Sequence, residues 1–349
     1  MNTIPTIFNE FPSSYTVVGG NERLASTGLS AVILNRPGRY SRRHFFQELQ
    51  KIGFDYVISL ELSPERYDLE ELTGCFPFVR FVLPHSKMNL GQRINIAACE
   101  LDSPMFFVLW NDLKLVAGGT AQRMAERLTA SLDDEQSEGQ KYNICKRLCT
   151  VPVIQNSRFE TLPTLSAPAV LKKKVSSLLF APNGEMSRYE AGAMPSLYPY
   201  DGIGIYDRGR FIRMGGFDSS LASAHWQLMD FGFRSHLWGE EICVSPQLKF
   251  SYDGTSSTED NTAEESYRRF YFKNLAPVFR GDYAHLPLRS FLRFLFLFHS
   301  DPFTAWEDFS KSRRWVKSNS LRWRFDIKAL TGRWDRMGEA LFRASSPSS

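Results

Sequence analysis

The sequence predicts an α/β fold in which a mostly parallel sheet is flanked by helices, and three observations carry this prediction. Four short apolar runs occupy residues 29–35, 54–60, 79–83 and 105–110. Continuous apolar runs of this length are typical of strands buried on both faces. Segments with helical spacing separate the runs, and alternating strands and helices imply right-handed crossovers between parallel strands. Polar residues follow three of the runs, which is where such sheets bind ligands.

The segments between the runs carry the helical pattern. Phe46, Leu49 and Ile52, for example, recur at the spacing that places them on one helix face. The helices expected here are 41–52, 68–73, 91–100 and 118–131. Residues 1–28 precede the first run and contain the turn Gly19-Gly20, so we expect an irregular leader.

Prolines dominate the stretch from 151 to 200. Because proline lacks the N–H that strands and helix interiors need, we expect a long excursion with few regular elements. The elements expected beyond it are a strand pair at 203–214, a helix at 225–238, a strand at 242–252 and a helix at 263–279. The domains expected are a leader (1–28), a main domain (29–254) and a C-terminal helical extension (255–349).

Composition indicates a folded protein that dissolves in water. Hydrophobic residues make up 43% and charged residues 23% of the chain, unlike a disordered sequence. The N-terminus lacks the basic start and apolar stretch of a secretory signal. The most apolar stretch, 291–298, contains Arg293 and is too short to span a bilayer. The five cysteines form no CxxC pair, and an odd count fits a reducing compartment. We therefore expect a cytoplasmic protein.

The positive charge belongs to the extension. Residues 311–343 contain ten Lys or Arg and three acids, whereas the whole chain has a net charge of only +4. Basic residues are interleaved with four tryptophans of the extension, Trp306, Trp315, Trp323 and Trp334. Such a segment either lies on an anionic membrane surface, which would place the protein at the inner face of the membrane, or packs on the main domain. No recognised nucleic-acid-binding module accompanies it, so no nucleic acid partner is expected.

Polar residues stand just after three of the predicted strands. Asn35, Glu61 and Asp112 hold these places, with Asn111 beside Asp112. The carboxyl ends of parallel strands meet at one edge of a sheet, so we expect these side chains to converge. A carboxylate on a rigid strand end can ligate Mg²⁺ or Mn²⁺. The plainer interpretation of Asn111-Asp112 is a turn, because both residue types favour turns.

Two further polar pairs have both a functional and a plain interpretation. Arg93 and Asn95 lie near the start of the helix at 91–100, where backbone N–H groups can bind phosphate. An ordinary loop-to-helix junction explains the same residues. Asp230 and Arg234 lie four apart on a later helix and can form a simple ion pair. No Walker A or HExxH motif occurs in the sequence.

In their order along the chain, these segments resemble glycosyltransferase family 2, which has the GT-A fold. The matching segments are LSAVILNRPGRY, VISLELSPE, NLGQRINIAACELDSP, MFFVLWNDLKL, GIGIYDRGRFIRMGGFDSS and HWQLMDFGFRSHLWG. They cover about residues 29–254, and Gly-Gly-Phe-Asp with the helix after it is the most specific part. The resemblance implies a GT-A-type, Rossmann-like, mostly parallel sheet flanked by helices, followed by the C-terminal helical extension.

The resemblance also implies an activity and roles for single residues. It implies sugar transfer from a nucleoside diphosphate sugar to a hydroxyl of a glycan or glycolipid acceptor, with inversion, in polysaccharide or glycolipid assembly. The residues it assigns to nucleotide-sugar binding are Asn35, Glu61, Ser63, Arg93, Asn95, Asn111, Gly215, Gly216 and Arg234. Asp112 matches the last acid of the family's Asp-x-Asp motif, which implies a divalent metal, Mg²⁺ or Mn²⁺. Asp218 and Asp230 are the expected catalytic carboxylates.

This chain departs from the family pattern at several positions. Trp110 replaces the first acid of Asp-x-Asp, and Tyr252 or Asp253 stands where a later histidine ligand is common. Gln227 and Leu228 occupy the acidic positions that usually supply the general base. The alternative is therefore a catalytically inactive GT-A-like binding or scaffolding protein. A sugar-nucleotide pyrophosphorylase fits less well, because its Gly-rich first loop is missing.

Overall fold

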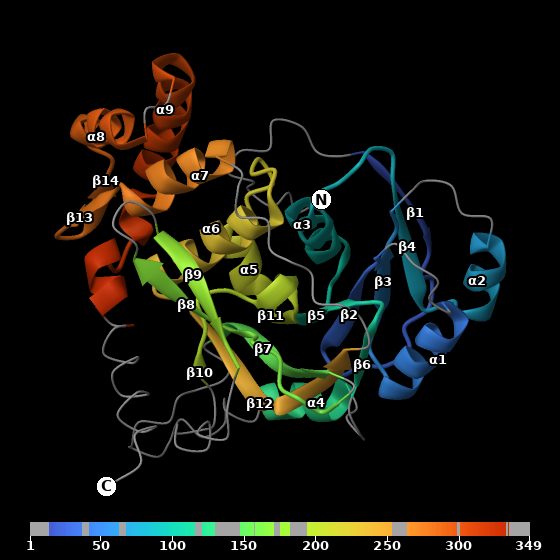
Figure 1. Cartoon of the computed structure of the whole chain (residues 1–349). Helices are drawn as coiled ribbons and strands as arrows, with labels where there is room; N and C mark the ends of the chain where they lie inside the picture. Colours follow the sequence, from blue (N-terminus) through green and yellow to red (C-terminus); the bar gives the residue numbers. More distant parts are fainter. Residues whose placement is uncertain are drawn as a thin grey trace, which may run out of the picture.

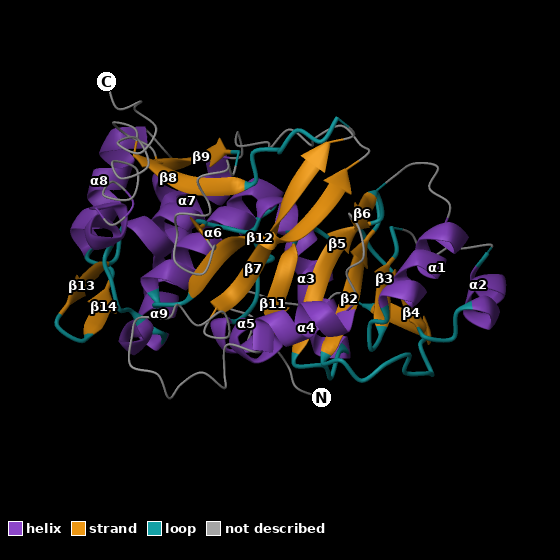
Figure 2. Ribbon diagram, turned by 90° about the horizontal axis from the view of Figure 1, so that it is seen from below, coloured by secondary structure: helices purple, strands orange, loops and turns teal. Residues whose placement is uncertain are grey.

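The computed structural model describes residues 14–334, apart from 37–41, 63–67, 116–120, 130–146, 157, 171–174, 182–193, 253–263, 299–300 and 333. A ten-stranded sheet runs through the molecule in the order β1-β4-β3-β2-β5-β11-β7-β12-β10, with β6 paired to β12 (Figures 1 and 2). Its strands are β1 (Tyr15–Gly19), β2 (Leu29–Leu34), β3 (Val57–Leu60), β4 (Val79–Pro84), β5 (Met105–Trp110), β6 (Leu113–Leu115), β7 (Arg147–Asn156), β10 (Met194–Pro195), β11 (Gly204–Asp207) and β12 (Glu241–Tyr252).

The other elements surround this sheet. The helices are α1 (Arg42–Ile52), α2 (Leu69–Cys75), α3 (Leu90–Glu100), α4 (Ala121–Thr129), α5 (Arg208–Met214), α6 (Ala224–Leu237), α7 (Glu264–Phe270), α8 (Leu288–Phe298) and α9 (Pro302–Ser318). Shorter elements are the hairpins β8 (Leu165–Val170) with β9 (Val175–Phe180) and β13 (Val278–Arg280) with β14 (Tyr283–His285), the 3₁₀ turns η4 (Tyr200–Gly202) and η6 (Ser320–Arg322), and the π-helix η5 (Tyr271–Leu275). Figures 1 and 2 place α3 and α6 on one face of the sheet and α4 on the other.

The four strands expected first form a parallel half-sheet. β4, β3, β2 and β5 lie side by side, and each neighbouring pair is parallel. Every residue of β2 and β3 is buried, which is why these strands read as continuous apolar runs. The carboxyl ends of these strands meet at one edge of the sheet, called the carboxyl edge below. The predicted fold class is confirmed at this level.

The second half of the sheet brings other segments to the same edge. β11 is antiparallel to both β5 and β7, and β12 is parallel to β7. The start of β11 therefore lies at the carboxyl edge, as does the end of β12. β6 pairs with the end of β12, where Leu113 lies opposite Tyr252. Residues that are far apart in sequence thus meet above β2 and β5.

The leader is not irregular throughout, because Tyr15–Gly19 forms the strand β1 at the sheet edge, antiparallel to β4. An edge strand is buried on fewer sides, and this one has only partly buried and exposed residues. The strand pair expected at 203–214 is also wrong in its second half, which is the helix α5. The Asp207 side chain begins this helix by accepting a hydrogen bond from the Arg210 N–H at 2.7 Å.

The proline-rich stretch contains a central strand, contrary to expectation. β7 continues through Pro152, which lies opposite Ser245 of β12. The register between the two strands shifts directly after this pair, and β11 pairs with β7 only at Cys149 and Thr150. Proline is tolerated because its missing N–H falls where the ladder is already interrupted.

The C-terminal extension packs against the main domain. The ring of Trp238, the residue directly after α6, stacks on Trp315 with centroids 5.7 Å apart, and Trp323 packs on both rings. Trp315, Trp323 and Trp334 are buried, whereas Trp306 remains 48% exposed. The packing interpretation of the extension is therefore correct for three of its four tryptophans. None of the described helices combines the length and the apolar character needed to cross a bilayer.

Candidate active site

The strand-end residues predicted from the sequence meet at the carboxyl edge. The Asn35 side-chain amide donates to Ser59 Oγ at 3.1 Å and to the Leu60 carbonyl at 3.0 Å, so it links the ends of β2 and β3. Ser59 Oγ donates in turn to Glu61 at 2.8 Å. Glu61 is almost fully buried and also accepts a hydrogen bond from Arg42 at 2.6 Å. The convergence of Asn35, Glu61 and Asp112 on one edge is confirmed; Ser63 lies outside the described residues.

Asp112 is held by an arginine that the sequence analysis did not assign. Arg36 Nε lies 3.0 Å from Asp112 Oδ2, and the same guanidinium forms an ion pair with Asp201. The guanidinium carbon lies 4.0 Å from the centroid of the Trp110 ring, a cation–π distance. The Arg36 N–H also donates to Asn111 Oδ1 at 3.1 Å. One positive charge therefore joins two carboxylates from distant parts of the chain.

Asp201 is the acid that the sequence analysis missed. It lies in η4, just before β11, and reaches the site because β11 begins at the carboxyl edge. Its φ of +52° lies in the left-handed region, which is uncommon for a residue other than glycine. Trp110 Nε1 donates to its carbonyl at 3.1 Å, which helps to hold this conformation. The available signal was the Asp201-Gly202 dipeptide, which is typical of turns.

Burial shifts the pKa values of Asp112 and of its neighbour Tyr252. Burial raises the pKa of Asp112 above its ordinary value, although Arg36 and the Tyr252 hydroxyl act in the opposite direction. Burial also raises the pKa of Tyr252 to about 12; the negative charges of Asp112 and Asp201 add to this shift, and Arg36 opposes it. Tyr252 therefore stays a neutral hydrogen-bonding phenol over the whole physiological pH range.

Arg93 supplies a second positive charge beside the first. Its guanidinium lies 5.4 Å from the Trp110 ring centroid, and its Nε and Nη1 have no hydrogen-bond partner among the described residues. Burial lowers the pKa of Arg93 to about 10, an effect that Asp201 opposes and Arg36 reinforces. A buried cation with open donors is costly unless an anion satisfies it. The arrangement is chemically suited to binding an oxyanion.

The backbone N–H groups at the start of α3 already have partners within the protein. Asn89 and Gln92 form a capping box, with both hydrogen bonds at 2.9 Å. The Gly91 N–H donates to Gln227 Oε1 at 2.8 Å. Gln227 is fully buried and ties α6 to α3, so the residue at the usual general-base position has a structural contact instead.

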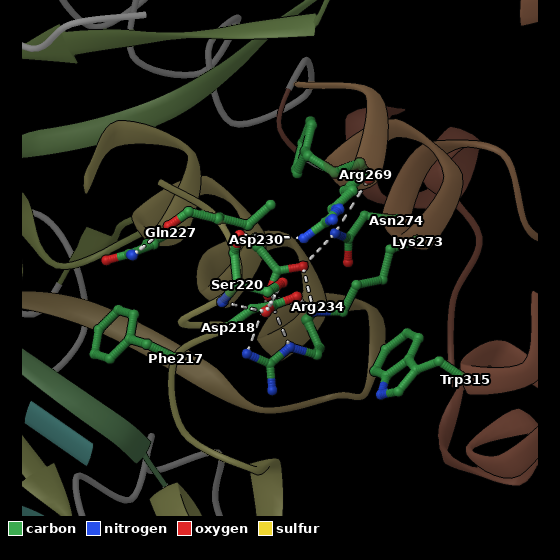
Figure 3. Close-up of polar contacts among 12 residues, drawn as sticks. Phe217, Asp218, Ser220, Gln227, Asp230, Arg234, Arg269, Lys273, Asn274 and Trp315 are labelled. Carbon is green, nitrogen blue, oxygen red and sulfur yellow. Dashed lines mark hydrogen bonds and ion pairs between the residues drawn. The ribbon is translucent and has the colours of Figure 1, made fainter. Parts of the chain in front are cut away.

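The remaining predicted residues form a separate buried cluster (Figure 3). Lys273 Nζ lies 2.8 Å from Asp218 and 2.8 Å from Asp230. Asn274 donates to Asp230 at 2.7 Å, and Arg234 forms an ion pair with Asp230 at 3.2 Å. All these groups are buried. Burial would raise the pKa of the Asp218 carboxyl, but Lys273 and Ser220 hold it below its ordinary value. Asp218 and Asp230 are thus neutralised by ion pairs in this state.

Asn95, Gly215 and Gly216 hold the turn beside this cluster. The Asn95 amide donates to the Phe217 carbonyl at 2.8 Å and accepts from the Phe217 N–H at 2.9 Å. Both glycines have positive φ, and a Cβ on Gly216 would lie 2.3 Å from Asn95 Oδ1. Arg234 donates to the Gly216 carbonyl at 2.6 Å. Their contacts are those of a tightly packed turn.

The carboxyl-edge group fits a divalent cation. Neither oxygen of Asp112 receives a well-aligned hydrogen bond from a described residue, and Asp201 is the second carboxylate on the same guanidinium. Among the described residues, no three His, Cys, Asp or Glu side chains form a complete metal site. Mg²⁺ is usually bound by only one or two carboxylates, with substrate phosphates completing its shell. Asp112 and Asp201 match that incomplete type of site.

No family model matches the sequence, and no curated protein matches it either. The structure of GalNAc-T7 with UDP, GalNAc and Mn²⁺ is similar to 72% of this chain with a TM-score of 0.50 and 12% identity. The fold is of the GT-A type. The similarity covers 48% of GalNAc-T7, so the chain spans about half the length of that protein.

A second solved structure is more distant. It is the mannosyltransferase PcManGT from Pyrobaculum calidifontis in complex with GDP-Man and Mn²⁺, with a TM-score of 0.40 and 9% identity over 95% of this chain and 84% of that one. Membership of this chain in glycosyltransferase family 2 stays a prediction.

Proposed function

We propose that this protein is a glycosyltransferase, of the family 2 type, that transfers a sugar from a nucleoside diphosphate sugar to an acceptor hydroxyl. The observation that carries the proposal is the meeting of Arg36, Arg93, Asp112 and Asp201 at the carboxyl edge of a GT-A-type sheet. Sheets of this kind bind nucleotides at that edge. The paired charges are those that a diphosphate and a divalent cation require. Inversion at the sugar and a role in polysaccharide or glycolipid assembly belong to the same proposal.

In this proposal the donor lies across the ends of β2, β3 and β5. Asn35 and Glu61, which follow β2 and β3, hold the nucleoside together with Ser63. Arg93 donates its open N–H groups to the diphosphate, and Arg36 turns from Asp112 toward the same anion. Both guanidiniums stabilise the negative charge that develops on the leaving diphosphate.

Asp112 and Asp201 are the residues that would hold Mg²⁺ or Mn²⁺. Such an ion, when bound beside a diphosphate, supplies Lewis-acid stabilisation of the leaving group. The neighbouring side chains hold this group in place. Trp110 donates a hydrogen bond to the Asp201 carbonyl, and Asn111 accepts one from the backbone N–H of Arg36. Trp110, which replaces the family's first acid, thus contributes a cation–π face and a hydrogen-bond donor rather than a ligand.

Asp218 and Asp230 are proposed as the proton acceptors, since they are the nearest acids to the usual base positions in sequence. Either one must first leave its ion pair with Lys273 before it can accept a proton from an acceptor hydroxyl. A closed cluster at this place equally favours a second candidate function, a GT-A-like binding or scaffolding protein. Buried Gln227 and Leu228 are the specific observation behind that alternative.

Titration calorimetry with UDP-sugars and GDP-sugars, with and without Mn²⁺, tests the donor site. We expect wild type to bind one class, and Arg93→Gln and Asp112→Asn to weaken binding roughly 10- to 100-fold, as hydrogen bonds to charged groups do. Arg210→Gln is the matched control, because α5 follows the opposite end of β11 and Arg210 pairs with Glu240. Absence of binding for every nucleotide sugar would rule out the proposed function.

Turnover separates the two candidate functions. The proteins that bind a donor are incubated with it and with a panel of glycan and glycolipid acceptors, and released nucleoside diphosphate is measured. Release that depends on an acceptor supports the transferase. Tight donor binding without release in any combination supports the binding protein.

A further inference from the structure

The helix α8 exposes large apolar side chains in addition to the apolar side chains that it buries. Phe291 and Phe294 are buried; Phe294 packs on Phe272 and Phe291 packs on Phe309, which accounts for one side of the helix. On the other side, Leu288 is 49%, Leu292 61% and Phe296 82% exposed. These three residues recur at four-residue spacing, so they form one stripe along the helix.

The beginning of α9 exposes two more aromatic side chains. Phe303 is 86% exposed and Trp306 is 48% exposed. The Trp306 ring packs on Phe291 and Phe309 at centroid distances of 5.2 and 5.6 Å, so it is fixed between the two helices. We call Leu288, Leu292, Phe296, Phe303 and Trp306 the α8–α9 face. Figure 1 shows α8 and α9 together at one end of the molecule, away from the half-sheet of β2, β3 and β4.

Basic residues accompany the α8–α9 face. Arg289 and Arg293 follow Leu288 and Leu292 directly and are exposed as well. Successive helix residues are about 100° apart, so these arginines lie beside the stripe. Arg313, Arg314 and Lys317 are exposed further along α9. The acids nearby are engaged locally, since Asp301 caps α9 by accepting from the Thr304 N–H at 2.9 Å and Glu307 pairs with Lys311 at 2.9 Å. The face is therefore apolar with a positive border.

We propose that the α8–α9 face docks on a membrane that contains anionic phospholipids, with its aromatic and leucine side chains inserted at the level of the headgroups. Phe and Leu on one face with Lys and Arg beside them is the composition of helices that lie in a lipid interface. Long arginine stems can follow apolar surface while the guanidinium reaches a phosphate. A second copy of this chain fits less well, because a self-complementary contact would bring arginines against arginines.

The docking surface differs from the one that the sequence suggested. Trp315, Trp323 and Trp334 are buried and unable to enter a lipid layer. The inference does not rest on the proposed transfer reaction, since lipid binding needs no nucleotide. If both hold, docking brings the site to acceptors that are themselves anchored in the membrane.

Vesicle flotation of the full chain tests the inference. We expect wild type to float with vesicles of phosphatidylcholine and phosphatidylserine and to stay in solution with phosphatidylcholine alone. The double variant Arg289→Gln/Arg293→Gln should lose roughly 30-fold in affinity, from about a factor of five for each basic residue near an anionic surface. Phe296→Ser/Phe303→Ser should lose at least about tenfold through the apolar contribution. Circular dichroism and thermal melting confirm that the variants are folded.

Phe159→Ser is the matched control, because Phe159 is 74% exposed but lies after β7, outside the α8–α9 face. It should float like wild type. Equal flotation of wild type and both double variants, or no flotation of any protein, overturns the inference. A wild-type dimer in sedimentation that Phe296→Ser/Phe303→Ser converts to a monomer also overturns it, and assigns the face to a second copy. Nucleotide-sugar binding in solution is measured in parallel and reports on the proposed function alone.

Discussion

Lys273 is the residue whose removal should damage this fold most clearly. It is 1% exposed and pairs with Asp218 and Asp230, which are equally buried. Lys273→Met keeps the length of the side chain and removes its charge, so two buried carboxylates are left with less compensation. Breaking a buried ion pair from one side costs about 3–5 kcal/mol. We therefore expect the free energy of unfolding to fall by about that amount at pH 7.

Urea denaturation of wild type, Lys273→Met and Lys311→Met measures the effect. Lys311 pairs with Glu307 at the surface, so its loss should cost less than about 1 kcal/mol. Adding Asp218→Asn to Lys273→Met should recover part of the loss, because one uncompensated charge is removed. A Lys273→Met protein within about 1 kcal/mol of wild type would show that the cluster is not a coupled set of ion pairs.

The sign of the pH dependence of folding stability follows from the pKa of Asp218. Lys273 holds the pKa of Asp218 below its ordinary value, so this contribution to stability is present above the unfolded carboxyl pKa and is lost as the pH falls through the folded one. In Lys273→Met, burial dominates and the folded-state pKa of Asp218 rises. The folded variant then gains protons on acidification, and the stability gap to wild type should be smaller at pH 5 than at pH 7. A gap that widens at pH 5 contradicts this assignment.

Three more predictions concern the two clusters. Arg36→Gln should raise the affinity for Mn²⁺ at least about tenfold, because the guanidinium no longer competes for Asp112 and Asp201. Electron paramagnetic resonance without nucleotide measures this affinity. Unchanged affinity would show that these acids do not hold the ion. Asp201→Asn should lower the same affinity by about tenfold or more, and a variant equal to wild type would leave Asp112 as the sole acidic ligand. Gly216→Ala should destabilise by more than about 2 kcal/mol in urea, since positive φ and the approach to Asn95 add together. Gly53→Ala, with positive φ but open space around the Cβ, should cost only about 1 kcal/mol, and equal losses would refute the steric argument.

The half-sheet was predictable because each of its strands carries its own signal. Val57–Leu60 and Leu29–Leu34 are buried on both faces, so a local apolar run is sufficient evidence of a strand. Parallel pairing then fixes where Asn35, Glu61 and Asp112 must meet. β1 and β7 carried no such signal: the first is half exposed, and the second contains Pro152 at an interruption of the ladder.

The candidate site was only partly predictable, because its charges come from pairs that local patterns do not reveal. Arg36 and Asp201 lie far apart in sequence, and most strands of the sheet fall between them. A strained turn at Asp201 brings this acid to the carboxyl edge. Asp230 and Arg234 do form the i,i+4 ion pair that their spacing allows. Nothing near them in sequence points to Lys273, which arrives from η5 in the extension.

The placement of Lys273 has a consequence for how the protein is made. The ribosome synthesises the sheet segments that precede η5 first, at roughly 5–20 residues per second. These segments therefore leave the ribosome before Lys273 is available. Until η5 has left the exit tunnel, Asp218 and Asp230 lack Lys273, and Arg234 is the positive neighbour that is already in place. We expect the nascent chain to stay loosely packed and open to chaperones at this stage, and to close in one late step when η5 delivers the missing ammonium group.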